Sequence, residues 1–201
     1  MNSKSIIFIF SLGIILGSAF LLMPSENKAL HGQLITSEHP VGGDFTLSAA
    51  DGEHSLSDYA GKLVLIYFGY TYCPDICPTN LGNLSMAYQG LSQAEKDNLQ
   101  ILFVSVDPAR DTPARLQQYV NYFDANIIGL TGEAKNIAKI AKRYGVVYAK
   151  VDNPDNGTNY AVDHSAFTYV VDQTGQLQTQ LPHATSPQQF IKAVKKYQTR
   201  S

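Results

Sequence analysis

Residues 62–81 read K-L-V-L-I-Y-F-G-Y-T-Y-C-P-D-I-C-P-T-N-L and contain the only two cysteines of the chain. Within them, residues 63–68 are hydrophobic throughout and rich in strand-forming side chains. A strand that is apolar on both faces is usually buried in the middle of a sheet. Pro78 suits the first position of a helix, where its missing N–H costs nothing. Cys73 and Cys77 therefore lie at a predicted strand-to-helix turn.

The two cysteines are predicted to sit in a compact loop. Each precedes a proline, and a residue before proline is disfavoured in the α region. Cys77 would then be the N-cap of the following helix, where unpaired backbone N–H groups and the helix dipole would lower its pKa. A structural disulfide is the alternative, although a bond that closes so short a loop constrains the unfolded chain little. The pattern favours a ligating or redox pair.

The rest of the chain alternates strands with helices, which indicates an α/β layer fold. Further strands are predicted at residues 100–106, 126–130, 146–151, 165–171 and 176–180, and further helices at 113–123, 133–144 and 187–197. Asp51-Gly52 predicts a hairpin before the first long strand. The late hairpin, residues 165–180, adds antiparallel pairing, so we expect a mixed sheet flanked by helices on both faces.

Composition limits the classes of function. The chain has 201 residues, of which 44% are hydrophobic and 16% charged, as expected for one globular domain with a short appendage. Its formal net charge of −2 offers no basic footprint, so nucleic-acid binding is not expected.

The N-terminus predicts export. Residues 6–23 form a nearly continuous apolar run that follows Lys4, close to the minimum length of a membrane-spanning helix. Positive charge before the run places the remainder outside the cytoplasm. We favour an uncleaved anchor in residues 1–23 over a cleaved signal peptide, because apolar residues continue past the small residues 17–19. Residues 24–40 then read as a tether and residues 41–201 as the folded domain, in an oxidising compartment.

One of the five histidines stands apart. His164 follows Asp163 and opens the predicted strand 165–171, so a sheet could bring it beside another strand-end loop. Asp163 could orient its ring. From the residues alone, His164 is either an edge histidine or a third ligand. The other four are expected to be solvated: His31, His39, His54 and His183.

Three segments resemble the Sco/SenC family, the copper-binding, thioredoxin-like assembly proteins of cytochrome oxidase. They are Y-F-G-Y-T-Y-C-P-D-I-C-P, V-D-P-A-R-D-T-P-A-R-L and Y-A-V-D-H-S-A-F-T-Y-V-V-D, in that order. The likeness covers residues 41–197. It implies that Cys73, Cys77 and His164 bind copper, with Asp163 in support.

The middle segment contains Asp107, Arg110 and Asp111, which match the family pattern D-P-x-R-D-T-P. We interpret these residues as a structural turn that leads into a helix, with Thr112 as the N-cap and Pro113 as the first helical residue.

The implied ligand set suits copper. Two thiolates and an imidazole form a soft, three-coordinate site for Cu(I) that could also hold Cu(II). Zinc would more often need a fourth protein ligand, which the sequence does not obviously offer.

The sequence thus predicts a copper chaperone, anchored in a bacterial inner membrane and facing the periplasm, that helps load a copper site of cytochrome c oxidase. Expected partners are the copper-binding subunit of the oxidase and other copper chaperones or thiol reductants. The competing prediction is a thiol-disulfide oxidoreductase that keeps the oxidase cysteines reduced. Against it stand the C-x-x-x-C spacing and the absence of a proline directly before Ser165, where His164 appears instead.

Overall fold

The computed structural model describes residues 40–151 and 160–198. None of the helices in these two ranges is long and apolar enough to span a membrane. The predicted anchor, nearly all of the tether, His31 and His39 lie outside the described residues, as do residues 152–159.

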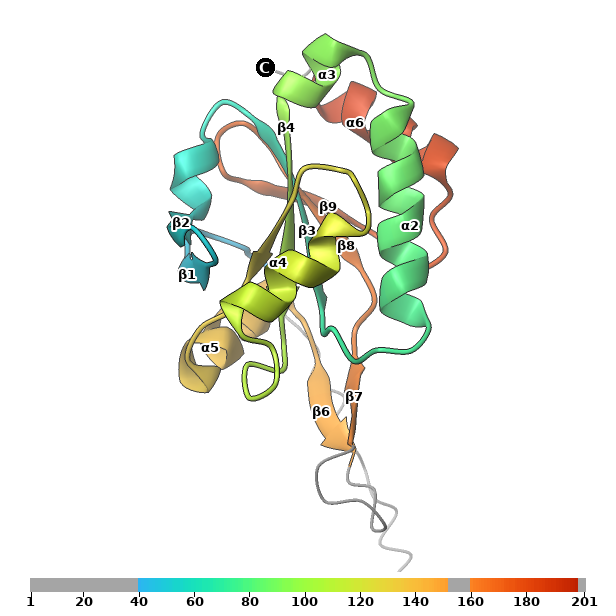
Figure 1. The fold of residues 1–201 in the computed structure, drawn as a ribbon. Coiled ribbons are helices and arrows are strands. Elements are labelled where there is room, and N and C mark those ends of the chain that lie inside the picture. Colours follow the sequence, from blue (N-terminus) through green and yellow to red (C-terminus); the bar gives the residue numbers. More distant parts are fainter. Residues whose placement is uncertain (1–39, 152–159, 199–201) are drawn as a thin grey trace, which may run out of the picture. The chain divides into compact units, whose positions relative to one another are not determined.

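A five-stranded mixed sheet organises the fold, as predicted (Figure 1). Its strand order is β5-β4-β3-β8-β9. Strand β3 lies at the centre, parallel to β4 and antiparallel to β8, while β5 extends the parallel half and β9 the antiparallel half. The strands are β3 (Leu63–Gly69), β4 (Leu99–Ser105), β5 (Ile127–Leu130), β8 (Thr168–Val171) and β9 (Leu177–Leu181). Every residue of β3 and β4 is buried, which explains their continuous hydrophobic sequences.

Helices cover both faces of the sheet. Neighbouring residues of a strand point to opposite faces of the sheet, so Tyr67 of β3 lies on one face and Phe68 on the other. The ring of Tyr67 lies 6.2 Å from that of Phe103, which in turn lies 5.5 Å from Tyr119 of α4. The ring of Phe68 lies 5.6 Å from Tyr144 of α5 on the other face. The helices are α2 (Ile76–Gln89), α3 (Gln93–Asp97), α4 (Pro113–Asn121), α5 (Ala134–Tyr144) and α6 (Pro187–Gln198), with α6 packed on α2.

The predicted N-terminal hairpin is confirmed. Strands β1 (Thr46–Ala49) and β2 (Gly52–Ser55) pair antiparallel and lead into a short 3₁₀ helix, η1 (Leu56–Tyr59), that was not predicted. The short helix α3 also lacks the long apolar periodicity by which a helix is predicted.

A second two-stranded sheet differs from the prediction. Strands β6 (Tyr148–Val151) and β7 (Ala161–His164) form an antiparallel hairpin that extends beyond the main sheet (Figure 1). His164 therefore ends β7 and does not open the next strand, which begins only at Thr168. Strand β7 has one buried residue among four and shows no apolar run, which is why the sequence pattern missed it.

The start of α2 also differs from the prediction. The N-cap is Asp75, so Cys77 is the second helical residue and Pro78 the third. Proline is tolerated there because the first four N–H groups of a helix have no partner within the helix. The predicted start of α4 is correct: Thr112 is the N-cap and its hydroxyl accepts a hydrogen bond from the backbone N–H of Arg115 at 3.2 Å.

Candidate metal centre

Three side chains capable of binding a metal meet where β3 ends. Cys73 lies in the loop of residues 70–75 between β3 and α2, here called the cysteine loop, and Cys77 lies in the first turn of α2. His164 arrives from the end of β7. Their ligand atoms all lie within 4.8 Å of one another, and no other group of three or more such residues occurs in the described ranges. The three residues predicted as ligands are thus adjacent in space; their role as ligands remains a prediction.

The histidine ring is oriented by the backbone. Nε2 of His164 lies 3.3 Å from Sγ of Cys77, and Nδ1 lies 3.2 Å from the carbonyl oxygen of Ser165. A carbonyl only accepts hydrogen bonds, so Nδ1 is the donor in this contact, and in the neutral imidazole Nε2 then presents its lone pair to the sulfur. The side chain of Asp163 is exposed, since neighbouring residues of β7 point to opposite sides. The Ser165 carbonyl therefore has the orienting role that was expected of Asp163.

The two thiols are electrostatically different. The Cys77 thiol donates a hydrogen bond to Cys73, and this lowers the pKa of Cys73 and raises the pKa of Cys77. The backbone N–H of Cys77, 3.4 Å from Sγ of Cys73, further favours the Cys73 thiolate, whereas burial further raises the pKa of Cys77. The expectation of a lowered pKa at Cys77 is therefore wrong. Both cysteines are free, buried thiols.

Aromatic side chains and a glycine surround the sulfur of Cys77. Its Sγ accepts a hydrogen bond from the buried hydroxyl of Tyr67 at 3.9 Å. The ring of Tyr70 lies 5.8 Å from that of His164, at 89° to it, and its hydroxyl accepts a hydrogen bond from the backbone N–H of Val162. A Cβ on Gly69 would lie 2.7 Å from the sulfur, so only glycine fits without displacement.

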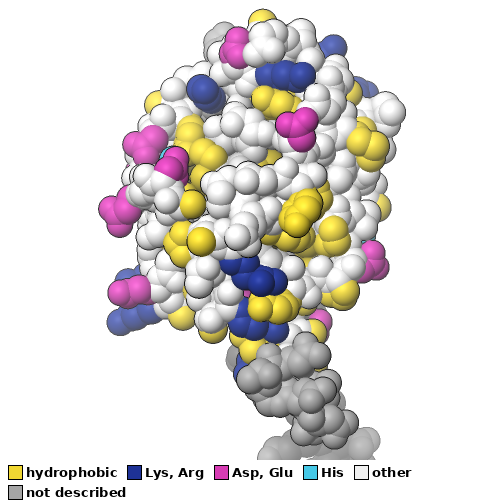
Figure 2. All heavy atoms as spheres, viewed as in Figure 1, with side chains coloured by type: hydrophobic (Ala, Val, Ile, Leu, Met, Phe, Trp, Pro, Cys, Tyr) yellow, Lys and Arg dark blue, Asp and Glu magenta, His cyan; other side chains and the backbone are white. Residues whose placement is uncertain are grey.

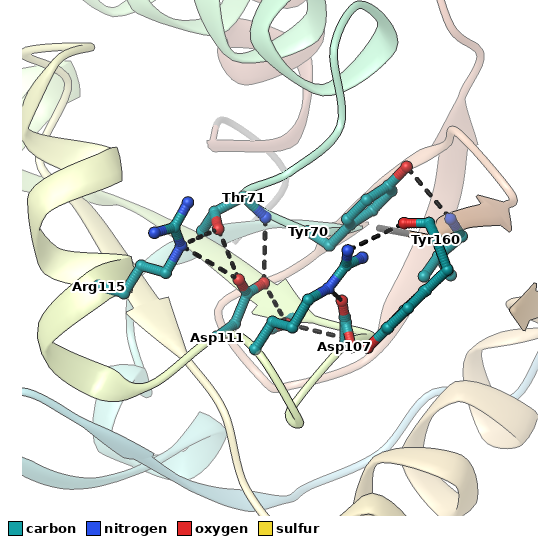
Figure 3. A network of polar contacts seen from close by, with 9 residues as sticks. Tyr70, Thr71, Asp107, Asp111, Arg115 and Tyr160 are labelled. Carbon is teal, nitrogen blue, oxygen red and sulfur yellow. Dashed lines mark hydrogen bonds and ion pairs between the residues drawn. The ribbon is translucent and has the colours of Figure 1, made fainter. Parts of the chain in front are cut away.

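A buried carboxylate fixes the cysteine loop to the main sheet (Figure 3). Asp111 is completely buried. Its Oδ2 accepts hydrogen bonds from the backbone N–H of Thr71 at 3.0 Å and from the hydroxyl of Ser105 at 2.6 Å. Its Oδ1 accepts from the hydroxyl of Thr71 at 2.6 Å and lies 3.9 Å from Nε of Arg115. Since Thr71 lies two residues before Cys73, Asp111 restricts where that thiol can lie.

Arg110 connects the cysteine loop to the hairpin that carries the histidine. Its Nε pairs with Oδ2 of Asp107 at 2.5 Å, and its Nη1 donates to the carbonyl of Tyr160 at 2.9 Å. The hydroxyl of Tyr160 donates to Oδ1 of Asp107 at 2.7 Å. The guanidinium also lies over the rings of Tyr160, at 3.6 Å, and Tyr72, at 4.5 Å. The D-P-x-R-D segment is the predicted turn and cap, and in addition it joins both halves of the site.

Basic and aromatic side chains alternate across this region. The charged group of Lys150 lies 4.1 Å from the ring centroid of Tyr160. The guanidinium of Arg110 lies 3.6 Å from the ring centroid of Tyr160 and 4.5 Å from that of Tyr72. The guanidinium of Arg115 lies 4.0 Å from the ring centroid of Tyr72. Figure 2 shows Lys and Arg side chains beside hydrophobic ones at this end of the molecule. Each contact contributes about 0.5–2 kcal/mol, depending on how far it is desolvated.

Comparison with known proteins identifies the family. A family model described as SCO1/SenC matches residues 34–199. The chain belongs to the SCO1/SenC family.

Relatives from this family agree with the fold. An SCO2-like protein of Rickettsia felis is 39% identical over 199 residues, which cover 96% of this chain and 97% of that protein. The copper-bound structure of ScoI from Bradyrhizobium japonicum is 35% identical with a TM-score of 0.71, over 78% of this chain and 99% of that one. BsSco is described as a member of the Sco family of cytochrome c oxidase assembly proteins that has a disulfide switch. Its structure is 25% identical with a TM-score of 0.62, over 82% of this chain and 97% of that one. The predicted thioredoxin-like, mixed α/β sheet of a Sco/SenC protein is confirmed.

Two further histidines of this SCO1/SenC chain lie away from the site. His54 is only partly buried and was expected to be solvated, yet Nδ1 lies 2.6 Å from the hydroxyl of Tyr59 and Nε2 lies 2.8 Å from a carboxylate oxygen of Asp51. His183 is exposed, as expected. Neither belongs to the three-ligand group.

Proposed function

We propose that this chain binds copper through Cys73, Cys77 and His164 and helps load a copper site of cytochrome c oxidase. The observation that carries the proposal is the convergence of the three ligand atoms within 4.8 Å at the end of β3. A relative with 35% identity has copper bound in its solved structure, and another is described as a protein of oxidase assembly.

The ligand chemistry favours copper over other metals. Thiolate and imidazole ligands select soft ions, and Cu(I) accepts a set of three. The group offers no fourth His, Cys, Asp or Glu ligand among the residues described, whereas structural zinc sites usually have four. Cu(II) could also be held by the same set. Binding requires both sulfurs to be thiolates, so copper competes with any proton that they still carry.

The burial of the ligands suggests how copper leaves. Cys77 is completely buried, Cys73 is 7% exposed, and His164 is partly exposed. A client ligand would approach from the His164 side and displace the histidine first, while the buried thiolate is released last. Copper would thus pass by stepwise ligand exchange.

We also propose the arrangement of the whole chain: an anchor or signal segment in residues 1–23, a tether in 24–40 and the copper-binding domain in 41–201. The apolar run at residues 6–23 supports the anchor. The domain would then face the periplasm from a bacterial inner membrane. Its partners there would be the copper-binding subunit of the oxidase and other copper chaperones or thiol reductants.

An anaerobic Cu(I) titration tests the proposal. The reduced full-length chain in detergent micelles would compete with a Cu(I) chelator, beside Cys73→Ser, Cys77→Ser and His164→Ala. We expect one tight site per chain, abolished by either cysteine substitution. The histidine substitution should weaken it at least ten- to a hundredfold, since loss of a hydrogen-bond partner of a metal ligand alone costs that much. His54→Ala is the matched control and should bind like the wild type. Tight binding that survives loss of either cysteine would refute the ligand assignment.

A thiol-disulfide oxidoreductase is the second candidate. Two free thiols lie side by side, with the backbone N–H of Cys77 donating to Sγ of Cys73, and BsSco is described by a disulfide switch. In this role the two cysteines would cycle between dithiol and disulfide while a client disulfide is reduced. Rapid reduction of a client disulfide, together with weak copper binding by the same preparation, would favour this function over copper delivery.

A further inference from the structure

The hydroxyl of Tyr67 is aimed at one of the proposed ligands. Tyr67 lies on β3 and is completely buried. Its Oη donates a hydrogen bond to Sγ of Cys77 at 3.9 Å, a distance within the range for sulfur acceptors. A buried hydroxyl without a partner costs about 1–3 kcal/mol, and the contact with sulfur avoids this cost for Tyr67.

The ring of Tyr67 is held in place from two sides. It stacks on Phe103 with centroids 6.2 Å apart and planes at 24°. It also meets the ring of His164 nearly at right angles, at 76° and 6.1 Å. Tyr67 therefore contacts two of the three proposed ligands: its hydroxyl contacts Cys77 and its ring contacts His164. With the ring fixed, the position of the hydroxyl oxygen relative to the sulfur is determined.

We propose that Tyr67 donates a hydrogen bond to the Cys77 thiolate of the copper-loaded site and thereby favours Cu(I) over Cu(II). This inference rests on the proposed function. A metal-bound cysteine is a thiolate and can only accept a hydrogen bond, whereas the phenol O–H of Tyr67 is the donor in this contact. A hydrogen bond withdraws electron density from the sulfur. Hydrogen bonds around a cysteine sulfur are known to tune the preference of copper sites between the two oxidation states.

A second tyrosine provides a matched control. Tyr119 of α4 lies in the same aromatic layer, with its ring 5.5 Å from Phe103. Its hydroxyl is buried and has no hydrogen-bond partner among the described residues. Tyr67→Phe and Tyr119→Phe each remove one buried oxygen from this layer, but only the first removes a donor to sulfur. A difference between them therefore reports the hydrogen bond and not the loss of packing volume.

The test measures Cu(I) and Cu(II) affinities and the sulfur-to-Cu(II) charge-transfer band for the full-length wild type and both variants. For Tyr67→Phe we expect the ratio of Cu(I) to Cu(II) affinity to fall about three- to tenfold, as for the loss of one hydrogen bond. The band should also move to longer wavelength, because the sulfur becomes a stronger donor. Tyr119→Phe should change neither. A Tyr67→Phe protein with the ratio and the band of the wild type would overturn the inference alone, whereas a wild type that binds no copper would overturn the proposed function and the inference with it.

Discussion

Replacing Gly69 with alanine tests how closely the site is packed. An added Cβ would lie 2.7 Å from Sγ of Cys77, 2.8 Å from Cε2 of Phe103 and 3.2 Å from Cε1 of Tyr67. Ordinary non-bonded contacts lie near 3.5–4.0 Å, so the sulfur and the Phe103 ring must each move by roughly 1 Å. All three neighbours are completely buried.

The magnitude follows from this displacement. Overpacking of a buried site costs about 1–3 kcal/mol, and the lower entropy of unfolded alanine returns about 0.4–1 kcal/mol. We therefore expect Gly69→Ala to lower the free energy of unfolding by about 1–2 kcal/mol. Because metal sites tolerate ligand shifts of only about 0.2 Å, Cu(I) affinity should fall at least tenfold.

The assay is urea unfolding of the metal-free, reduced protein, followed by Cu(I) competition. Gly82→Ala is the control, since a Cβ at Gly82, inside α2, meets nothing within 4 Å. That change should stabilise the protein by about 0.5–1 kcal/mol, because alanine is the better helix former, and leave copper binding unchanged. If Gly69→Ala unfolds at the same urea concentration as the wild type and binds Cu(I) equally well, the packing described around Cys77 is wrong.

Three further predictions concern the groups around the ligands. Asp111→Asn should destabilise the protein by about 2–4 kcal/mol in urea unfolding, because it places an amide donor against the donors of Thr71 in a buried site; a loss below about 0.5 kcal/mol would contradict the network. The logarithm of the Cu(I) affinity should rise by about one per pH unit from about pH 7 to 9. The reason is that Cys73, with its lowered pKa, is already a thiolate, so only Cys77, with its raised pKa, must release a proton. A slope near two in pH-dependent competition titrations would show that both thiols are protonated. Arg110→Lys keeps the charge but loses the planar fork, so amide hydrogen exchange in β7 should accelerate about tenfold, and unchanged exchange would show that the arginine does not hold the hairpin.

Local patterns predicted most of the sheet. Strand β3 and β4 are buried on both faces, so their hydrophobic runs identified them, and Thr112 with Pro113 marked the start of α4 correctly. The start of α2 was placed two residues too late, because proline is accepted anywhere in the first helical turn. The assignment of the lowered pKa to the wrong cysteine followed from this shift, since the hydrogen bond between the two thiols depends on their actual positions.

Local patterns could not predict the site, because it is formed by residues that lie far apart in the chain. His164 lies 87 residues from Cys77 along the chain, and from the residues alone it could not be told from an edge histidine. The resemblance to a family supplied the expectation, and the pairing of β6 with β7 shows how the ring reaches the sulfur. The role of Asp111 was not predicted, because it depends on β3 and β4 lying side by side, so that Ser105 and Thr71 meet one carboxylate.

The ligand set of bound Cu(I) is the most direct test of the account. Copper X-ray absorption spectroscopy of the full-length protein, loaded anaerobically with one Cu(I) per chain, counts the sulfur and nitrogen neighbours of the metal. We predict two sulfur ligands and one nitrogen ligand, with the nitrogen lost in His164→Ala. A spectrum with one sulfur or none in the wild type, or one that His164→Ala leaves unchanged, would contradict the proposed centre.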